Sequence, residues 1–341
     1  MSLVNNTAPD FSIPAAYRAC DFPFAVQADS EGYHPAACHF LALCMKLVYE
    51  RPAVIQDIIE NQWGVTWHQY LSTGLRGSDR LYLDAKDKAQ FEPHTRTMVL
   101  ETERAVVVAF RGSEPTNLIN FRSSGRITLL PQSGMGRVHA GFWSCLFWGD
   151  AEGGTLYSRI VETLDALPDP DKPIYLTGHS LGAALALLFA QAANAQHPQL
   201  ARRIAGVYGF AAPRVGDAAF AAACEAAYPQ RIHHFVHASD IVPRVPPMIL
   251  EYRHTGKERF ITSLGRVLSD EAQIKRWHRI EGFGFLPLYL YKIGAGILTR
   301  GETLRTVYRV VLLVVLPGLA DHWPSDYEAA IRRQIDRHES G

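Results

Sequence analysis

The chain has 341 residues, 48% of them hydrophobic, so it can bury a large core, and we expect one large domain with additions rather than two independent domains. Its 34 basic and 34 acidic side chains give a formal net charge of zero, which argues against a nucleic-acid-binding face. Contact with a membrane surface would therefore depend on apolar side chains rather than on charge.

The cysteines and the N-terminus bear on the compartment. An odd number of cysteines at irregular spacings forms neither a disulfide framework nor a zinc-binding pattern, so we expect buried free thiols in a reducing compartment. Residues 1–10 are polar and lack the features of a secretory signal peptide, so we expect an intracellular protein. The five cysteines are Cys20, Cys38, Cys44, Cys145 and Cys224.

The first part of the chain is predicted to be an arm followed by helices. Residues 1–34 mix proline, aspartate and aromatic residues without a period, which indicates an irregular arm. Apolar residues recur at helical spacing over residues 35–49, which predicts an amphipathic helix. A second short helix is predicted over residues 54–61, and Gly64 would end it.

The middle of the chain alternates between strand and helix patterns. Continuous β-branched runs are typical of strands buried on both faces, so the alternation predicts a mainly parallel sheet with helices on both faces. A further strand, over residues 248–254, is predicted to cross the end of this sheet. The other predicted strands are residues 98–100, 105–110, 173–177, 206–211 and 232–237, and the helices are 156–167, 183–196 and 218–227.

A serine stands at one strand-to-helix junction. Gly-His-Ser-Leu-Gly at residues 178–182 follows a predicted strand and precedes an alanine- and leucine-rich helix. This order is typical of a nucleophile elbow, where glycines on both sides permit the tight turn and the serine hydroxyl stands at a helix N-terminus. The helix dipole and free N–H groups there favour developing negative charge. We therefore predict Ser180 as a catalytic nucleophile, against the alternative of a glycine-rich turn with an incidental serine.

An acyl-transfer site also needs donors for the oxyanion. One is usually the N–H of the residue after the nucleophile, here Leu181. The second should come from a loop at the end of another strand. Ser113, after the valine-rich strand, fits this position, although Arg-Gly-Ser by itself is also an ordinary turn.

Five segments of the chain form a recognisable ordered set. They are Ala-Phe-Arg-Gly-Ser at 109–113, Val-His-Ala-Gly-Phe at 138–142, Thr-Gly-His-Ser-Leu-Gly-Ala at 177–183, Ala-Pro-Arg-Val-Gly at 212–216 and Asp-Ile-Val-Pro-Arg-Val-Pro-Pro at 240–247. In this order they resemble the class 3 lipases, the fungal and plant triacylglycerol lipase family. The resemblance covers roughly residues 35–330 and implies an α/β-hydrolase fold, hydrolysis of carboxylic esters and no cofactor.

The resemblance also suggests roles for residues 113–127. Ser113 lies where the family has its second oxyanion-hole residue. Residues 114–127 lie where the family has a mobile lid, with Leu118, Ile119 and Phe121 as an apolar face. Such a lid would expose its lipid-binding surface only on opening. The alternative is an ordinary surface loop.

Asp240 is the predicted acid of the triad. It follows the strand predicted at residues 232–237, and the family motif places its acid at this position. A carboxylate at a strand end can hold the imidazole in one tautomer. Asp217 is the nearest rival, but it precedes an alanine-rich helix and is better explained as its N-cap.

His322 is the predicted base. It lies in a loop, before a Trp-Pro break and a helix, and its surroundings at residues 317–327 resemble the C-terminal block of the plant oil-body lipases. His179 is expected to pack locally. The other downstream candidates are His233, His234, His237, His254, His278 and His338.

The segment before His322 is predicted to be an apolar insertion at about residues 265–316. It holds two apolar stretches, 283–298 and 307–316, both shorter than the ~18 apolar residues of a membrane-spanning helix. One hypothesis is an interfacial element that docks on membranes or lipid droplets, or that builds an acyl-chain pocket. The alternative is a helical hairpin packed on the core or on a partner subunit.

Together these features predict a single α/β-hydrolase domain over residues 35–341 that hydrolyses lipid esters. We expect no cofactor, no metal and no nucleic-acid partner, and a lipid–water interface or membrane surface as the place of action. A phospholipase, a small-ester esterase or an acyltransferase would use the same residues. A non-enzymatic lipid-binding protein would need none of Ser180, Asp240 and His322, so their presence argues against that class.

Overall fold

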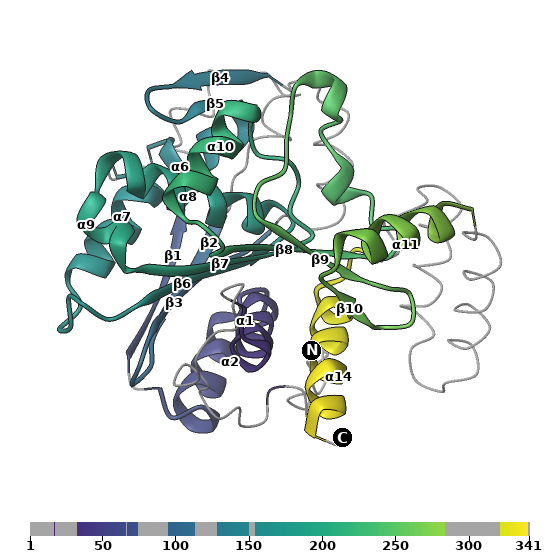
Figure 1. Ribbon diagram of the computed structural model, residues 1–341. Coiled ribbons are helices and arrows are strands. Elements are labelled where there is room, and N and C mark those ends of the chain that lie inside the picture. Colours follow the sequence, from purple (N-terminus) through teal and green to yellow (C-terminus); the bar gives the residue numbers. More distant parts are fainter. Residues whose placement is uncertain are drawn as a thin grey trace, which may run out of the picture.

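The computed structural model describes Tyr17 and residues 33–65, 67–73, 95–112, 128–149, 154–283 and 321–339. An eight-stranded sheet crosses the described part in the order β1-β2-β3-β6-β7-β8-β9-β10 (Figure 1). Strands β3, β6, β7, β8 and β9 run parallel, and the other pairs are antiparallel. The bounds are β1 (Trp67–Thr73), β2 (Thr95–Glu101), β3 (Val106–Phe110), β6 (Ile174–His179), β7 (Ile204–Phe210), β8 (Ile232–His237), β9 (Lys257–Ile261) and β10 (Val267–Leu268).

Helices cover both faces of the sheet (Figure 1). One face carries α6 (Ala140–Phe147), α7 (Leu156–Asp165), α8 (Leu181–Gln196), α9 (Pro198–Arg203) and α10 (Ala218–Ala227). The other face carries α1 (Pro35–Leu47), α2 (Pro52–Asp57) with the π-helical turn η2 (Ile58–Gln62), and α14 (Pro324–Glu339). The predicted α/β-hydrolase architecture, a mainly parallel sheet between two helical layers, is confirmed.

Strand β3 shows why the sheet is buried on both faces. All five of its residues are buried. Val106, Val108 and Phe110 belong to the apolar core under α7 and α8, whereas Val107 and Ala109 belong to the core that includes α1. Because successive side chains of a strand point to opposite faces, a continuous apolar run supplies both cores at once.

Helix α14 brings the C-terminal part of the chain back to the sheet. Tyr327, Ala330 and Ile331 are buried and share a core with residues of α1, which α14 contacts along its side (Figure 1). Burial of these apolar side chains holds α14 in place. The residues just before α14 are therefore placed by packing against an element near the other end of the chain.

Most predicted elements have counterparts, but the strand predicted over residues 248–254 is wrong. Pro246 and Pro247 cannot donate backbone hydrogen bonds, and the chain instead forms the 3₁₀ turn η4 (Met248–Leu250), followed by Glu251 at φ 68°. The strand that extends the sheet is β9. The sequence patterns did not predict β1, β9, β10, α6 or the separate hairpin of β4 (Leu129–Gln132) and β5 (Gly136–His139).

Several predictions fall on residues that are not described. The lid at 114–127 lies outside the described residues, and so does nearly all of both apolar stretches; only Phe283, the last residue of α11, is described. The described start of the insertion holds β10 and the helix α11 (Glu271–Phe283). No helix of the described part is both long and apolar enough to cross a bilayer.

The cysteines of the described part agree with the sequence interpretation. Cys38, Cys44 and Cys224 are buried and Cys145 is partly buried. No two of these four cysteines are joined to each other. Cys20 lies outside the described residues.

Candidate active site

Ser180 occupies the turn between β6 and α8 in a backbone conformation that few side-chain-bearing residues adopt. Its φ is 57° and its ψ is −124°. Its N–H donates to the Phe210 carbonyl at 2.9 Å, and its own carbonyl accepts from the N–H groups of Ala183 and Ala184. Such a conformation costs roughly 1–3 kcal/mol and is typical of functional sites. The turn thus holds the serine at the first turn of α8.

Both glycines of the turn are required by close backbone contacts. A Cβ at Gly182 would overlap the Phe110 carbonyl oxygen of β3, and a Cβ at Gly178 would overlap the backbone of Gly182. Helix α8 can therefore approach the sheet only if neither position carries a side chain. This agrees with the strand–turn–helix interpretation of the sequence.

Asp240 and His322 form a buried pair. The Asp240 Oδ2 atom lies 2.8 Å from His322 Nδ1 and also accepts from the Tyr327 hydroxyl at 2.7 Å, while Oδ1 accepts from the Val242 N–H at 2.9 Å. Asp240 has no solvent-exposed surface. Because a carboxylate can only accept, His322 Nδ1 is the donor of this pair, and in the neutral ring Nε2 then keeps its lone pair.

The hydroxyl and the second imidazole nitrogen are both buried atoms without a protein partner. Neither Ser180 Oγ nor His322 Nε2 has a hydrogen-bond partner among the described residues. The two side chains share a neighbour, because the ring of His179, next to Ser180 in the chain, lies 4.5 Å from the ring of His322 between centroids. The structure therefore brings a strained serine and an aspartate-bound imidazole to the same end of the sheet.

Polar contacts hold the loop of His322 against the end of β8. The Asp321 carboxylate accepts from the Ser239 hydroxyl at 2.8 Å and from its N–H at 3.2 Å. The Asp321 carbonyl lies 3.2 Å from His237 Nδ1. Tyr327, which donates to Asp240, accepts from the His237 N–H at 3.0 Å. Asp321 and Tyr327 therefore hold His322 and Asp240, the predicted base and acid, in place.

Tyr49 connects the nucleophile turn to the loop that follows β3. Its hydroxyl lies 3.2 Å from His179 Nδ1 and accepts from the Gly112 N–H at 3.1 Å. Desolvation by burial, and next the nearby His322, hold the pKa of His179 well below its usual range, so its ring is neutral at pH 7. Because the Gly112 N–H is engaged by Tyr49, it is not available to an oxyanion.

The predicted oxyanion-hole residues differ in what the structure describes of them. Leu181 is the first residue of α8, so its N–H belongs to the helix end that favours negative charge. Ser113 lies outside the described residues, and its role stays a prediction.

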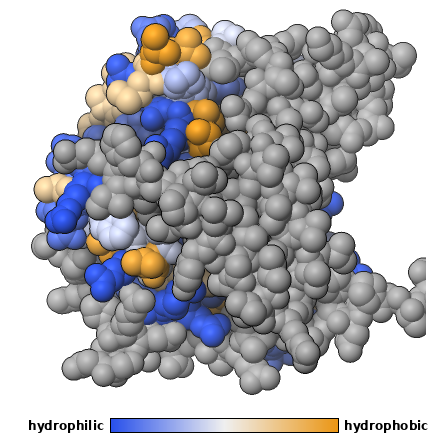
Figure 2. Space-filling view, turned by 90° about the vertical axis from the view of Figure 1, so that its right-hand side faces the viewer, coloured by the Kyte–Doolittle hydropathy of each residue, from blue (hydrophilic) through white to orange (hydrophobic). Residues whose placement is uncertain are grey.

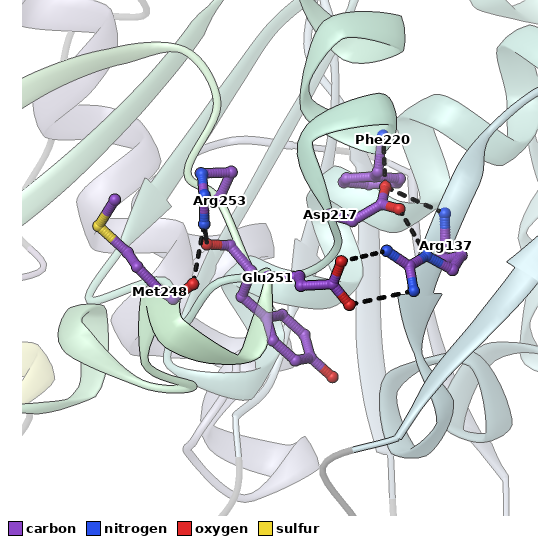
Figure 3. A network of polar contacts seen from close by, with 7 residues as sticks. Arg137, Asp217, Phe220, Met248, Glu251 and Arg253 are labelled. Atoms are coloured by element: carbon purple, nitrogen blue, oxygen red, sulfur yellow. Dashed lines mark hydrogen bonds and ion pairs between the residues drawn. The ribbon is translucent and has the colours of Figure 1, made fainter.

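The rival candidates have other partners. Asp217 accepts from the Phe220 N–H at 2.9 Å as the N-cap of α10, as predicted, and pairs with Arg137 at 2.8 Å (Figure 3). The rings of His234 and His254 stack 4.6 Å apart, and His254 Nε2 contacts the Pro243 carbonyl. The side chains of His278 and His338 are not among those described.

The sequence interpretation did not identify Tyr49, Asp321 or Tyr327 as site residues. Two of them were within reach, since Asp321 precedes His322 and Tyr327 lies on the helix that follows it. No sequence pattern links Tyr49, at the end of an N-terminal helix, to residue 179. In the described part of the chain, no group of three or more His, Cys, Asp or Glu side chains could hold a metal ion.

Comparisons with known proteins give the relatives of the chain. Residues 107–250 match the family model "Lipase (class 3)". Triacylglycerol lipase OBL1 of Arabidopsis thaliana is 23% identical over 344 residues, which cover 85% of this chain and 63% of the relative. A lipase of Rhizomucor miehei is 30% identical over 228 residues, which cover 62% of this chain and 60% of the relative. The matches thus span somewhat less than two thirds of the length of these relatives.

Among solved structures, lipase II from Rhizopus niveus superimposes with a TM-score of 0.47 and 21% identity, over 67% of this chain and 82% of that one.

Proposed function

Because the chain belongs to the class 3 lipase family, we propose that it hydrolyses carboxylic esters of lipids, with triacylglycerols as the substrate class. One observation carries the proposal. Ser180 stands strained at a helix N-terminus, and the imidazole of His322, bonded to the buried Asp240 and next to the ring of His179, has a nitrogen without a hydrogen-bond partner among the described residues. Nucleophile, base and orienting carboxylate are the three groups that acyl transfer through serine requires.

The proposed reaction proceeds through an acyl-enzyme. His322 Nε2 accepts the Ser180 proton as Oγ attacks the ester carbonyl, and Asp240 stabilises the imidazolium. The N–H groups of Leu181 and Ser113 bind the oxyanion. The tetrahedral intermediate expels the alcohol, which receives the proton from His322. Water, activated by the same imidazole, then releases the fatty acid and restores the hydroxyl.

Burial of the site bears on how a substrate enters. Ser180 has no exposed surface and His322 is almost fully buried. An ester carbonyl therefore reaches the hydroxyl only after part of the covering chain moves. The segment at residues 114–127 is our candidate for this movement, which would couple opening to contact with lipid.

Hydrolysis of p-nitrophenyl esters of graded chain length tests the proposal. We expect the wild type to favour one range of acyl length, and Ser180→Ala to lower kcat on the order of several thousandfold. Ser144→Ala is the matched control, because the Ser144 hydroxyl only bonds the Ala140 carbonyl within α6, and its kcat should stay within about twofold. Unchanged activity in Ser180→Ala, or an inactive wild type, would contradict the proposal.

A second assay decides the substrate class. Fatty-acid release is measured from emulsified triacylglycerol, from phosphatidylcholine and from a soluble short ester. We expect the highest rate on the triacylglycerol. A higher rate on phosphatidylcholine would favour a phospholipase, and a rate confined to the short ester would favour a small-ester esterase.

A further inference from the structure

The turn η4 exposes three consecutive apolar side chains. Met248 is 54% exposed, Ile249 88% and Leu250 43%. Only two other large apolar side chains of the described part, Trp148 and Leu264, are exposed to this degree. Single exposed apolar residues are ordinary on protein surfaces, but three in succession on one projecting turn are not.

Polar contacts brace this apolar turn from both sides. Arg253 donates to the Met248 carbonyl at 3.0 Å. Next to the turn, both Glu251 oxygens bind the Arg137 guanidinium, at 3.1 and 3.2 Å, and Arg137 also pairs with Asp217 (Figure 3). The turn is thus tied to β5, which carries Arg137, and to the start of α10. Its apolar side chains are displayed on a held backbone rather than on a loose loop.

The apolar turn stands at the end of the sheet that carries the proposed triad. It follows Asp240 by way of the 3₁₀ turn η3 (Val242–Arg244). Arg214, in the loop after β7, donates to the carbonyls of Arg244 and Pro246 and ties this connection down. Glu251, next to the turn, is linked through Arg137 to Asp217, which also follows β7. The turn is therefore tied to the loop after β7, which leaves the sheet at the same edge as the loop of Ser180 after the parallel strand β6.

Arginine side chains lie at the base of the apolar turn. Arg253 donates to the Met248 carbonyl and Arg214 to the Pro246 carbonyl, so both guanidinium groups contact the backbone at the turn. Arg244, four residues before Met248, is exposed. Glu251, the acid nearest the turn, is bound to Arg137. An apolar tip with cations at its base suits a surface of hydrocarbon and anionic headgroups.

We propose that residues 248–250 insert into the lipid–water surface and anchor the triad edge of the protein on its substrate phase. The inference rests on the proposed function, which makes a lipid phase the substrate. A second protein copy is a poor occupant, because stable protein interfaces bury about 800 Å² on each partner, more than three side chains supply. Insertion into lipid gains free energy from each apolar side chain separately.

Figure 2 shows hydrophobic side chains directly beside strongly hydrophilic ones at the upper end of the described surface, and further hydrophobic side chains lower down. Shallow insertion of a few apolar side chains does not require a spanning helix.

Flotation of the full chain with lipid vesicles tests the anchor. The variant Met248→Ser/Ile249→Ser/Leu250→Ser is compared with Leu264→Ser, because Leu264 is also 61% exposed but lies in the turn between β9 and β10. Vesicles are phosphatidylcholine with and without phosphatidylglycerol. We expect the triple variant to lower the partition coefficient on both kinds of vesicle about tenfold or more, and Leu264→Ser to leave it unchanged. Hydrolysis of a soluble short ester should be the same in all three proteins.

Each result has one meaning for the anchor. Wild-type protein that does not float, a triple variant that floats like wild type, or an equal loss in Leu264→Ser would overturn it. Loss of flotation confined to the triple variant supports it, even in a chain that hydrolyses no ester, so failure of the proposed function is seen separately. The variant Arg244→Gln tests the charge at the base of the turn. A loss of partitioning that is larger on vesicles with phosphatidylglycerol than on phosphatidylcholine alone would support a role for this charge.

Discussion

The nucleophile turn and the histidine loop meet at one end of the sheet but are held in place by different means. The turn at residues 178–182 is built from its own backbone and two neighbouring strands, through glycines that allow contact with β3 and a hydrogen bond from Ser180 to β7. The described residues around His322, 321–323, form neither helix nor strand. This loop is held by Asp321, by Tyr327 and by the packing of α14 against α1.

Ser180 is therefore positioned by local backbone geometry, whereas His322 is positioned by contacts with residues far away in the sequence. Asp240 and His322 are 82 positions apart in the chain, so closing that gap costs conformational entropy that only tertiary packing offsets. We therefore expect changes at the turn to disturb folding as well as activity. Changes around the loop should disturb activity more than folding.

Replacement of the base should have the largest effect. His322→Ala leaves Ser180 without a proton acceptor, so we expect kcat for ester hydrolysis to fall on the order of a thousandfold to ten thousandfold. His197→Gln, at an exposed position after α8, is the control and should stay within about twofold. A fall of less than tenfold in His322→Ala would show that another group serves as the base.

A side chain added to the turn at residues 178–182 should destabilise the fold, because it would overlap the backbone of a neighbouring strand. In Gly182→Ala the new Cβ overlaps the Phe110 carbonyl, so we expect the free energy of unfolding to drop by about 3 kcal/mol or more. Urea denaturation measures it. At Gly149 a Cβ would meet only ordinary contacts, so Gly149→Ala should change the free energy of unfolding by less than about 1 kcal/mol. Equal stability of the two variants would contradict the local account of the turn.

Loss of the Tyr327 hydroxyl, which bonds the predicted acid Asp240, should lower the rate of catalysis. Tyr327→Phe removes the hydroxyl that bonds Asp240 and the His237 N–H, so we expect kcat to fall about tenfold to a hundredfold. The matched control is Tyr252→Phe, whose hydroxyl is buried without a partner in the described part. If both variants kept full activity, Tyr327 would have only a packing role.

His179 lies between the nucleophile turn and the loop of His322. Its replacement should have the smallest effect, measured as a change in how the free energy of unfolding depends on pH. Burial lowers its pKa in the folded chain from 6.5, so below about pH 6.5 the unfolded chain binds a proton that the folded chain does not. The free energy of unfolding should therefore fall with decreasing pH. His179→Gln should make this slope shallower, by at most about 1.4 kcal/mol per pH unit. An unchanged slope would contradict a neutral His179.

The same distinction explains how much the sequence could predict. Ser180 and the order of strands and helices follow from local patterns, and the structure agrees with them. The strand predicted at residues 248–254 failed because apolar composition alone does not separate a strand from an exposed turn that follows two prolines. The exposure of the side chains at residues 248–250 could be determined only from the structure.

The remaining site residues depended on contacts that no short pattern contains. Asp240 and His322 were assigned by resemblance, because spacing alone left several aspartates and histidines open. Tyr49 could not be identified, since its role comes from the packing of α1 beneath the sheet, which places its hydroxyl between His179 and Gly112. Such residues contact the site across the fold rather than along the chain.

Labelling with a fluorophosphonate tests most directly whether Ser180, His322 and Asp240 act as one unit. The reagent forms a covalent bond to an activated serine oxygen, and intact mass with peptide mapping gives the rate and the position of the adduct. We predict one adduct, on Ser180, in the wild type, much slower labelling in Asp240→Asn and His322→Ala, and none in Ser180→Ala. An adduct on another residue, or labelling of His322→Ala as fast as wild type, would contradict the proposed site.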